Sequence, residues 1–255
     1  MPVRLGFDDH LDALKLAGAV LQAAAAEAGL GAEVPTCAEW DVAELVAHQG
    51  MVHRWAAANL RRENDHDTEE SLAEAATTPE LLAWFAGGLD SLIATLHTTP
   101  DDAEAMIFLV DAPAPRRFWA RRQAHETTLH SVDAMAGALA RRPSAGDVTI
   151  PAALAVDGID ELLCGFVPRP SSRLRTDEPF TVAVRASDTG DAWTMRVSAD
   201  PVVTMPEDTL RPDAVLSGTA VQLYLSLWNR ADEISAEGRT DVLDLWRSQV
   251  QVRWR

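Results

Sequence analysis

Lysine is nearly absent from this sequence, and acidic residues outnumber basic ones. Lys15 is the only lysine, and 22 basic residues stand against 39 acidic ones, for a formal net charge of −17. So acidic a chain lacks the basic surface that contacts nucleic-acid phosphates or an anionic membrane. We therefore expect neither nucleic acid nor a membrane as a partner. The preference for arginine, together with abundant alanine, is typical of a GC-rich genome such as an actinobacterial one.

Cysteine is scarce too, because only Cys37 and Cys164 occur, far apart and without a CxxC pair. This excludes a disulfide framework and a cysteine zinc finger. The N-terminus has no apolar core of a signal peptide, and no apolar run approaches a membrane span. We expect a cytoplasmic protein. The motifs GxxxxGK[ST], GxGxxG and GxSxG are missing, so nucleotide binding and the α/β-hydrolase mechanism have no support.

Helical periodicity dominates the first half of the chain. The pattern predicts helices over residues 9–28, 41–62, 79–97 and 115–142, with the polar segment 63–78 as a loop. Gly29 is a stop signal, Asp41 with Glu44 forms a capping box, and Pro115 suits a first helical position. Four helices joined by loops predict a four-helix bundle.

The second half changes to a mixed pattern. Residues 180–184 and 193–197 alternate between apolar and polar around a turn at Asp188–Asp191, which predicts a β-hairpin. Helices are expected over 151–164, 219–229 and 240–250. We therefore predict an α+β protein with two domains: a helical bundle over residues 1–145 and a smaller domain with a mostly antiparallel sheet over 146–255.

One helical stripe carries side chains with metal-binding chemistry. Glu126 and His130 are four residues apart, so they lie about 40° apart on one helix face. A carboxylate and an imidazole one turn apart form half of a metal site. His125 and His130 diverge by about 140° and cannot chelate together, so this is not an HExxH protease motif.

The same stripe has a simpler interpretation. Arg122 and Glu126 are an ordinary i,i+4 ion pair, and such a charged face is usually solvated. A third ligand would have to come from another helix, and periodicity does not choose between His48 and His53. The remaining histidines, including His10, fall near element ends or in loops, where we expect them at the surface.

Three segments resemble a known family. Residues 34–48 (VPTCAEWDVAELVAH) and 118–134 (FWARRQAHETTLHSVDA) are similar to the two histidine-bearing segments of the mycothiol-dependent maleylpyruvate isomerases. Residues 216–230 (LSGTAVQLYLSLWNR) are similar to that family's smaller, sterol-carrier-like domain. The resemblance implies a DinB-like bundle in which one histidine of the second helix and a later Glu/His pair hold a divalent metal, usually zinc.

Carried over position by position, the resemblance implies the metal ligands His48, Glu126 and His130. A zinc ion with three protein ligands keeps an open position, where a small thiol such as mycothiol would lose its proton. The thiolate would then add to a small electrophile, either as a cis–trans isomerase of the maleylpyruvate type or as an S-transferase. A thiol-responsive zinc regulator and a small-ligand-binding protein are the alternatives outside catalysis.

Three further residues are candidates for the catalytic machinery. Asp133 and Arg122 lie on the stripe of the ligand pair, where they could orient His130 and Glu126. Arg230, in the second domain, could pair with a substrate carboxylate. The alternative for Arg230 is a surface arginine at the end of a helix.

Overall fold

The computed structural model describes residues 5–63 and 65–252. The chain forms two compact units. One comprises Gly6–Phe108 and Pro113–Pro143, and the other comprises the chain from Ser144 onward together with the short segment Leu109–Ala112. Within the second unit, the backbone N–H of Val110 donates to the carbonyl of Gly165 at 3.4 Å. No pattern in the sequence indicates that this short segment groups with the later part of the chain.

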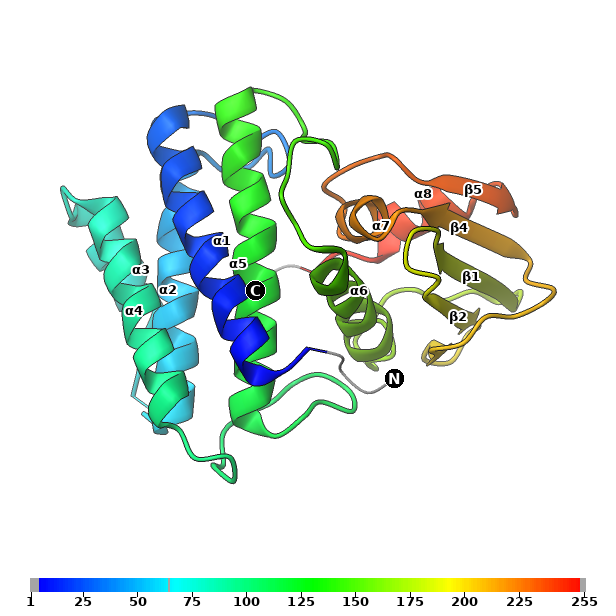
Figure 1. Ribbon diagram of the computed structural model, residues 1–255, viewed down its shortest axis with the longest axis horizontal. Helices are drawn as coiled ribbons and strands as arrows, with labels where there is room; N and C mark the ends of the chain where they lie inside the picture. The colour runs from blue at the N-terminus through cyan, green and yellow to red at the C-terminus, as the bar shows by residue number, and fades with distance from the viewer. Residues whose placement is uncertain (1–4, 64, 253–255) are drawn as a thin grey trace. The chain divides into compact units, whose positions relative to one another are not determined.

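The N-terminal unit is a helical bundle (Figure 1). Its helices are α1 (Phe7–Ala28), α2 (Val42–Arg61), α3 (Thr68–Thr77), α4 (Leu81–Thr98) and α5 (Pro115–Leu139). Helix α1 packs along α5, α2 packs along α4, and α2 also contacts α5. In the described part of this unit, β pairing is limited to one isolated bridge between Glu33 and Asp41. The α+β class and the helical first half are as the sequence predicts.

The helix boundaries follow from local capping chemistry. Asp41 accepts a hydrogen bond from the N–H of Glu44 at 2.8 Å, and Glu44 Oε2 accepts one from the N–H of Asp41 at 2.9 Å. This capping box satisfies two backbone donors at the start of α2. Gly29 ends α1 with φ 81°, a conformation that costs glycine little. Pro115 occupies the start of α5, where its missing N–H is not needed.

Helix α3 corrects the prediction of a loop over residues 63–78. It begins after Asp67, whose Oδ1 accepts a hydrogen bond from the backbone N–H two residues on, at 2.8 Å. Ser71 and Ala75, one turn apart, are its buried residues. Two small side chains make no apolar stripe, so hydrophobic periodicity does not reveal this helix. An N-cap aspartate and an alanine-rich turn were the available signals.

The C-terminal unit combines helices with a five-stranded sheet (Figure 1). Its elements are α6 (Ala152–Asp160), which continues as the π-helix η1 (Glu161–Phe166), then β1 (Phe180–Ala186), β2 (Ala192–Val197), β3 (Val203–Met205), β4 (Ala214–Gly218), α7 (Ala220–Leu227), β5 (Ser235–Gly238) and α8 (Val242–Gln249). The strand order is β3-β2-β1-β4-β5. Only the β1–β4 pairing is parallel, so the sheet is mostly antiparallel.

The predicted hairpin is the β1–β2 pair, with Val184 opposite Trp193. Val184 also pairs with Leu216 of β4, and all three side chains are fully buried. These residues form the apolar centre of the sheet. Within the described residues neither cysteine forms a disulfide bond. None of the helices in the described ranges is both long and apolar enough to span a membrane.

Candidate metal site

Helix α5 buries an exceptional number of polar side chains. It lies between α1 and α2, so most of its circumference faces other helices. The buried polar residues of this helix are Arg121, Arg122, Gln123, His125, Glu126, Thr127, Thr128, Ser131 and Asp133. Removing such groups from water costs free energy unless each finds a partner. The part of the bundle interior around these residues is therefore organised by polar contacts, and these contacts define the site.

The structure brings His48 of α2 together with Glu126 and His130 of α5. One potential ligand atom from each residue lies within 4.8 Å of the other two. The His48 and His130 rings meet edge to face, with centroids 5.2 Å apart and an interplanar angle of 77°. His48 and Glu126 are buried, and the His130 side chain is 12% exposed. One edge of the group therefore reaches solvent.

This group fits a divalent metal. Two imidazoles and a carboxylate are a catalytic zinc ligand set. Ligands of a tetrahedral ion with bonds of about 2.1 Å lie roughly 3.4 Å apart, so small side-chain rotations bring this group onto one ion. Three ligands from the protein leave a position for a small molecule.

His48 is held in the form that a metal requires. Burial, and secondarily the nearby His130, lowers the pKa of His48 from 6.5 to about 3. The imidazole is therefore neutral at physiological pH and keeps a lone pair for coordination. A neutral ring also adds no positive charge that would repel a cation.

Asp133 and Arg122 make the contacts that their positions on α5 suggested. Asp133 Oδ2 lies 2.9 Å from His130 Nδ1, and Asp133 is fully buried. Because a carboxylate only accepts hydrogen bonds, Nδ1–H of His130 donates to it, which leaves Nε2 of His130 available to a metal. Arg122 Nε lies 3.4 Å from Glu126 Oε2. Each of these two candidate ligands thus contacts a charged side chain of its own helix.

His53, the other histidine of α2 considered as a ligand, takes part in a different contact. Its Nε2 lies 2.9 Å from Gln49 Nε2 and 2.9 Å from Thr127 Oγ1. It is fully buried, and burial lowers its pKa from 6.5 to about 3. His53 is not a member of the group formed by His48. It belongs instead to a neutral polar layer between α2 and α5.

Comparison with known proteins identifies the family of this chain. Residues 11–135 match the family model described as the mycothiol maleylpyruvate isomerase N-terminal domain, and residues 153–245 match the MDMPI C-terminal domain. The chain belongs to the mycothiol-dependent maleylpyruvate isomerase family. Among curated protein sequences, none matches the chain.

Two solved structures share the fold. They are the crystal structures of a mycothiol-dependent maleylpyruvate isomerase and of a histidine-to-alanine mutant of that enzyme. Each is 16% identical to this chain, with a TM-score of 0.60, and the match covers 91% of this chain and 93% of the other. At this identity the likeness is one of fold, and it extends over both units of this family member.

Trp40 is a residue of the site that sequence reasoning did not single out. Its ring lies 4.7 Å from the His48 ring and 6.1 Å from the His130 ring, measured between centroids. The loop that carries it is closed by a hydrogen bond from the N–H of Val34 to the carbonyl of Trp40, at 3.2 Å. Trp40 directly precedes the α2 N-cap inside the family motif, which was the available signal. Its half-buried indole forms an aromatic wall beside two of the candidate ligands.

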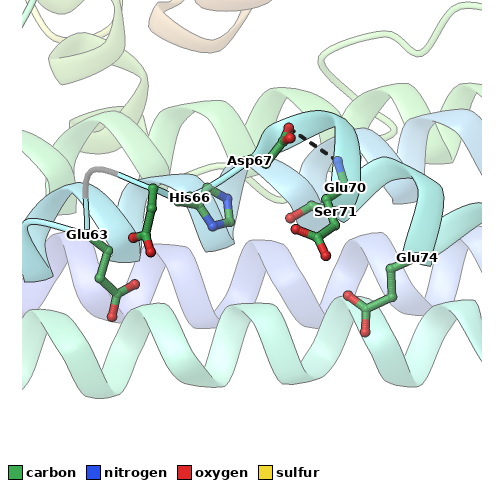
Figure 2. Close-up of a pocket in the computed structure, with 7 residues that line it drawn as sticks. Glu63, His66, Asp67, Glu70, Ser71 and Glu74 are labelled. Atoms are coloured by element: carbon green, nitrogen blue, oxygen red, sulfur yellow. Dashed lines mark hydrogen bonds between the residues drawn. The ribbon is translucent and has the colours of Figure 1, made fainter.

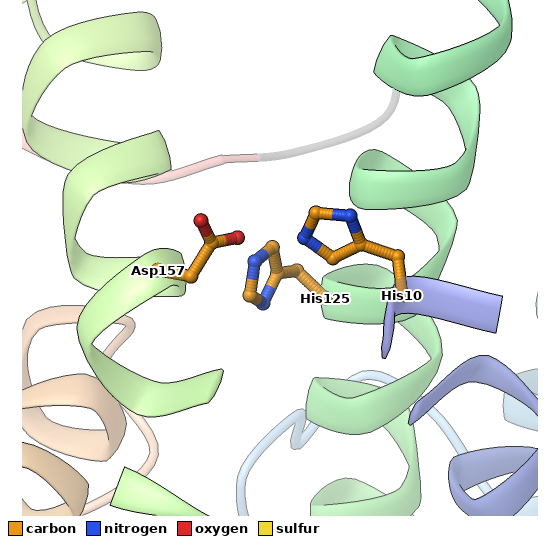
Figure 3. A group of neighbouring side chains, drawn as sticks. All are labelled: His10, His125 and Asp157. Carbon is orange, nitrogen blue, oxygen red and sulfur yellow. The ribbon is translucent and has the colours of Figure 1, made fainter. Parts of the chain in front are cut away.

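His10 corrects a second expectation, because it is 3% exposed and not at the surface. It lies in the first turns of α1, where that helix packs against α5, and its ring meets that of His125 at 6.2 Å (Figure 3). The helical pattern of α1 placed it near an element end, where burial is hard to foresee. Figure 3 also labels Asp157, which belongs to α6 of the C-terminal unit.

Arg230 lies in the C-terminal unit, just after α7. Its Nη1 donates a hydrogen bond to the carbonyl of Trp228 at 2.8 Å, and its side chain is half-buried. A cation near the end of a helix stabilises the terminal carbonyls. This contact gives Arg230 a structural role at the end of the helix. A role of Arg230 in binding a substrate carboxylate stays a prediction.

A separate pocket lies at the start of α3 (Figure 2). It is lined by Glu63, Asp65, His66, Asp67, Glu70, Ser71 and Glu74. The five carboxylates are exposed, and Asp67 is engaged as the α3 N-cap. Solvated acidic side chains of this kind need no ligand. The pocket contrasts with the buried histidine group and gives no sign of catalytic chemistry.

Proposed function

We propose that this family member is a zinc enzyme that uses mycothiol as a thiol cosubstrate and isomerises a small unsaturated keto acid of the maleylpyruvate type. The convergence of His48, Glu126 and His130 carries the proposal. Both family models and the shared fold support the thiol and the reaction class. The site needs no other cofactor for this chemistry.

A divalent metal in this position would lower the pKa of a bound thiol, so that the thiol is present as the thiolate. Residues of this chain prepare the site to hold such a metal. His48 stays neutral because it is buried, and Asp133 fixes the orientation of the His130 ring. Arg122 holds the carboxylate of Glu126. The indole of Trp40 lies beside the rings of both histidines.

The proposed reaction conserves the thiol. The sulfur forms a bond to one carbon of the activated C=C bond, and the electron pair of that bond moves onto the conjugated carbonyl oxygen. The former double bond is now single and rotates. The electron pair then returns, the C–S bond breaks, and the trans isomer leaves together with the regenerated thiolate. Atoms and electrons balance without an oxidant, a reductant or water.

An S-transferase would share the first step and stop there. The adduct would take up a proton and leave as a thioether, so one thiol would be consumed per turnover. The two reactions are therefore distinguished by the thiol balance. Isomerisation keeps the concentration of mycothiol constant, whereas transfer lowers it in proportion to product.

The test combines metal analysis with a turnover assay. Purified protein should contain close to one zinc per chain and should convert maleylpyruvate to fumarylpyruvate only when mycothiol is added. Glu126→Ala should lose metal and turnover together, because two ligands hold zinc poorly. Zinc-loaded protein that neither binds mycothiol by calorimetry nor turns over any thiol–electrophile pair would contradict the proposal and favour a thiol-responsive regulator.

A further inference from the structure

Gln123 is a buried amide that lies one turn before Glu126 on α5. It is fully buried, and its Nε2 donates a hydrogen bond to Glu126 Oε2 at 3.1 Å. The proposed metal site and reaction assign no role to this residue. The contact matters because its acceptor is the carboxylate of a proposed metal ligand.

The chemistry of the pair fixes the orientation of the amide. A carboxylate only accepts hydrogen bonds, so the NH₂ end of Gln123 must face Glu126. The Oε1 end is buried and makes no hydrogen bond to any residue in the described ranges. A buried amide with one end unsatisfied costs free energy. An apolar side chain of the same size would avoid that cost, so the benefit must lie in the bond to Glu126.

Gln123 Nε2 also lies closer to this oxygen than Arg122 Nε does. Arg122 Nε approaches Glu126 Oε2 at 3.4 Å, beyond the usual range for a strong hydrogen bond, whereas Gln123 approaches at 3.1 Å. Donors from two neighbouring positions on the helix restrict rotation of the carboxylate. Outer contacts of this kind typically change metal affinity by about 10–100-fold.

We propose that Gln123 is a positioning residue that sets the orientation of Glu126, and through it the metal affinity and coordination geometry of the site. This inference rests on the proposed metal site. In this proposal Gln123 acts through Glu126 and not by direct contact with substrate or metal.

The chain supplies a matched control in Gln49 of α2. Gln49 is also a fully buried glutamine, and its Oε1 likewise makes no hydrogen bond to the described residues. Its Nε2 donates to Thr127 Oγ1 at 3.0 Å and lies 2.9 Å from His53 Nε2. It therefore carries the same burial cost, but its hydrogen bonds go to residues outside the ligand group. A general effect of removing a buried amide should appear equally at both positions.

The experiment compares Gln123→Met with Gln49→Met in the full-length protein. Zinc affinity is measured by competition with a chromogenic chelator, and coordination geometry by the visible d–d absorption of the Co²⁺-loaded protein. Gln123→Met should weaken zinc binding by about 10–100-fold and shift the Co²⁺ bands. Gln49→Met should change affinity by less than about threefold and leave the spectrum unaltered. Thermal unfolding of the metal-free proteins reports the structural cost of each change.

Gln123→Leu provides a second variant, in case the methionine disturbs folding. It also removes the donor without adding a charge near the site, so it should likewise weaken zinc binding and shift the Co²⁺ bands. Equal affinities and identical spectra for the Gln123 and Gln49 variants would overturn the inference while leaving the proposed function intact. A wild-type protein that binds neither zinc nor Co²⁺ would overturn both. Metal binding without any thiol-dependent turnover would contradict the proposed function alone.

Discussion

The layer between α2 and α5 and the central strands of the sheet are buried equally well but are built from different side chains. In the sheet, Val184, Trp193 and Leu216 pair across β1, β2 and β4, and all three are apolar or largely so. On the two helices the buried residues include, beside apolar side chains, histidines, glutamines, carboxylates and arginines.

This difference separates residues that make the fold from residues that make the site. Apolar burial contributes roughly 25 cal/mol per Å² of area removed from water, and it accounts for the sheet without any function. Buried polar groups contribute little net stability even when they are paired. A layer as polar as the one around Glu126 is therefore retained for its chemistry, and the two regions should respond differently to substitution.

The largest expected effect is on metal binding. It can be tested by comparing two histidines of α2, one inside the ligand group and one outside it. His48 and His53 are both buried, and both have a pKa of about 3, but only His48 belongs to the ligand group. His48→Gln should weaken zinc binding on the order of 1,000-fold, about one ligand's share of the binding free energy. His53→Gln should leave zinc affinity within about tenfold. Isothermal titration with zinc measures both, and equal losses would refute the assignment of His48.

Trp193→Ala should show the opposite behaviour. The side chain is fully buried in the sheet, and its Nε1 donates to Asp160 Oδ1 at 3.1 Å. Its loss should lower the free energy of unfolding by about 3–5 kcal/mol, because a large cavity opens and a buried carboxylate loses a donor. Urea titration measures the change. Zinc affinity of the folded variant should match the wild type, and a folded variant with impaired zinc binding would erase the distinction between the two regions.

Arg230→Ala tests whether the C-terminal unit contributes to substrate binding. The variant should keep its zinc, because Arg230 is not a member of the ligand group. We expect KM for a dicarboxylate substrate to rise about tenfold, equivalent to one charged hydrogen bond of about 1.4 kcal/mol. Steady-state kinetics and metal analysis of the same sample decide the matter. Unchanged KM in an active enzyme would leave Arg230 as a helix-end contact to the carbonyl of Trp228.

The smallest expected effect concerns pH. The pKa of His53 is about 3 in the folded chain and 6.5 ordinarily, so between these values the unfolded chain binds more protons. The free energy of unfolding of the metal-free protein should therefore fall as the pH drops from 6.5 toward 3. His53→Gln should reduce this slope by at most about 1.4 kcal/mol per pH unit. Denaturant titrations at pH 5 and 6.5 measure it, and an unchanged slope would show that His53 is protonated in the folded state.

Local signals in the sequence were enough to predict much of this structure. Asp41 with Glu44, Gly29 and Pro115 mark helix ends through backbone chemistry that acts over a few residues, and the alternation around Asp188–Asp191 marks the hairpin. Helix α3 escaped prediction because its buried face consists of small residues, so it leaves no apolar stripe.

The site was predictable only in part, because it depends on packing between helices. Spacing on α5 placed Glu126 and His130 together, but periodicity could not decide between His48 and His53, and only the family resemblance favoured His48. The burial of His10 and the contacts of Trp40 and Gln123 depend on which helix lies opposite. Sequence spacing within one element carries no such information.

Anomalous X-ray diffraction at the zinc absorption edge, from crystals of the zinc-loaded protein, tests the metal site most directly. One strong peak should appear in the bundle, with Nε2 of His130, a nitrogen of His48 and a carboxylate oxygen of Glu126 at about 2.0–2.2 Å from it. A peak at any other position, or coordination by His53 in place of His48, would contradict the assignment of these three ligands.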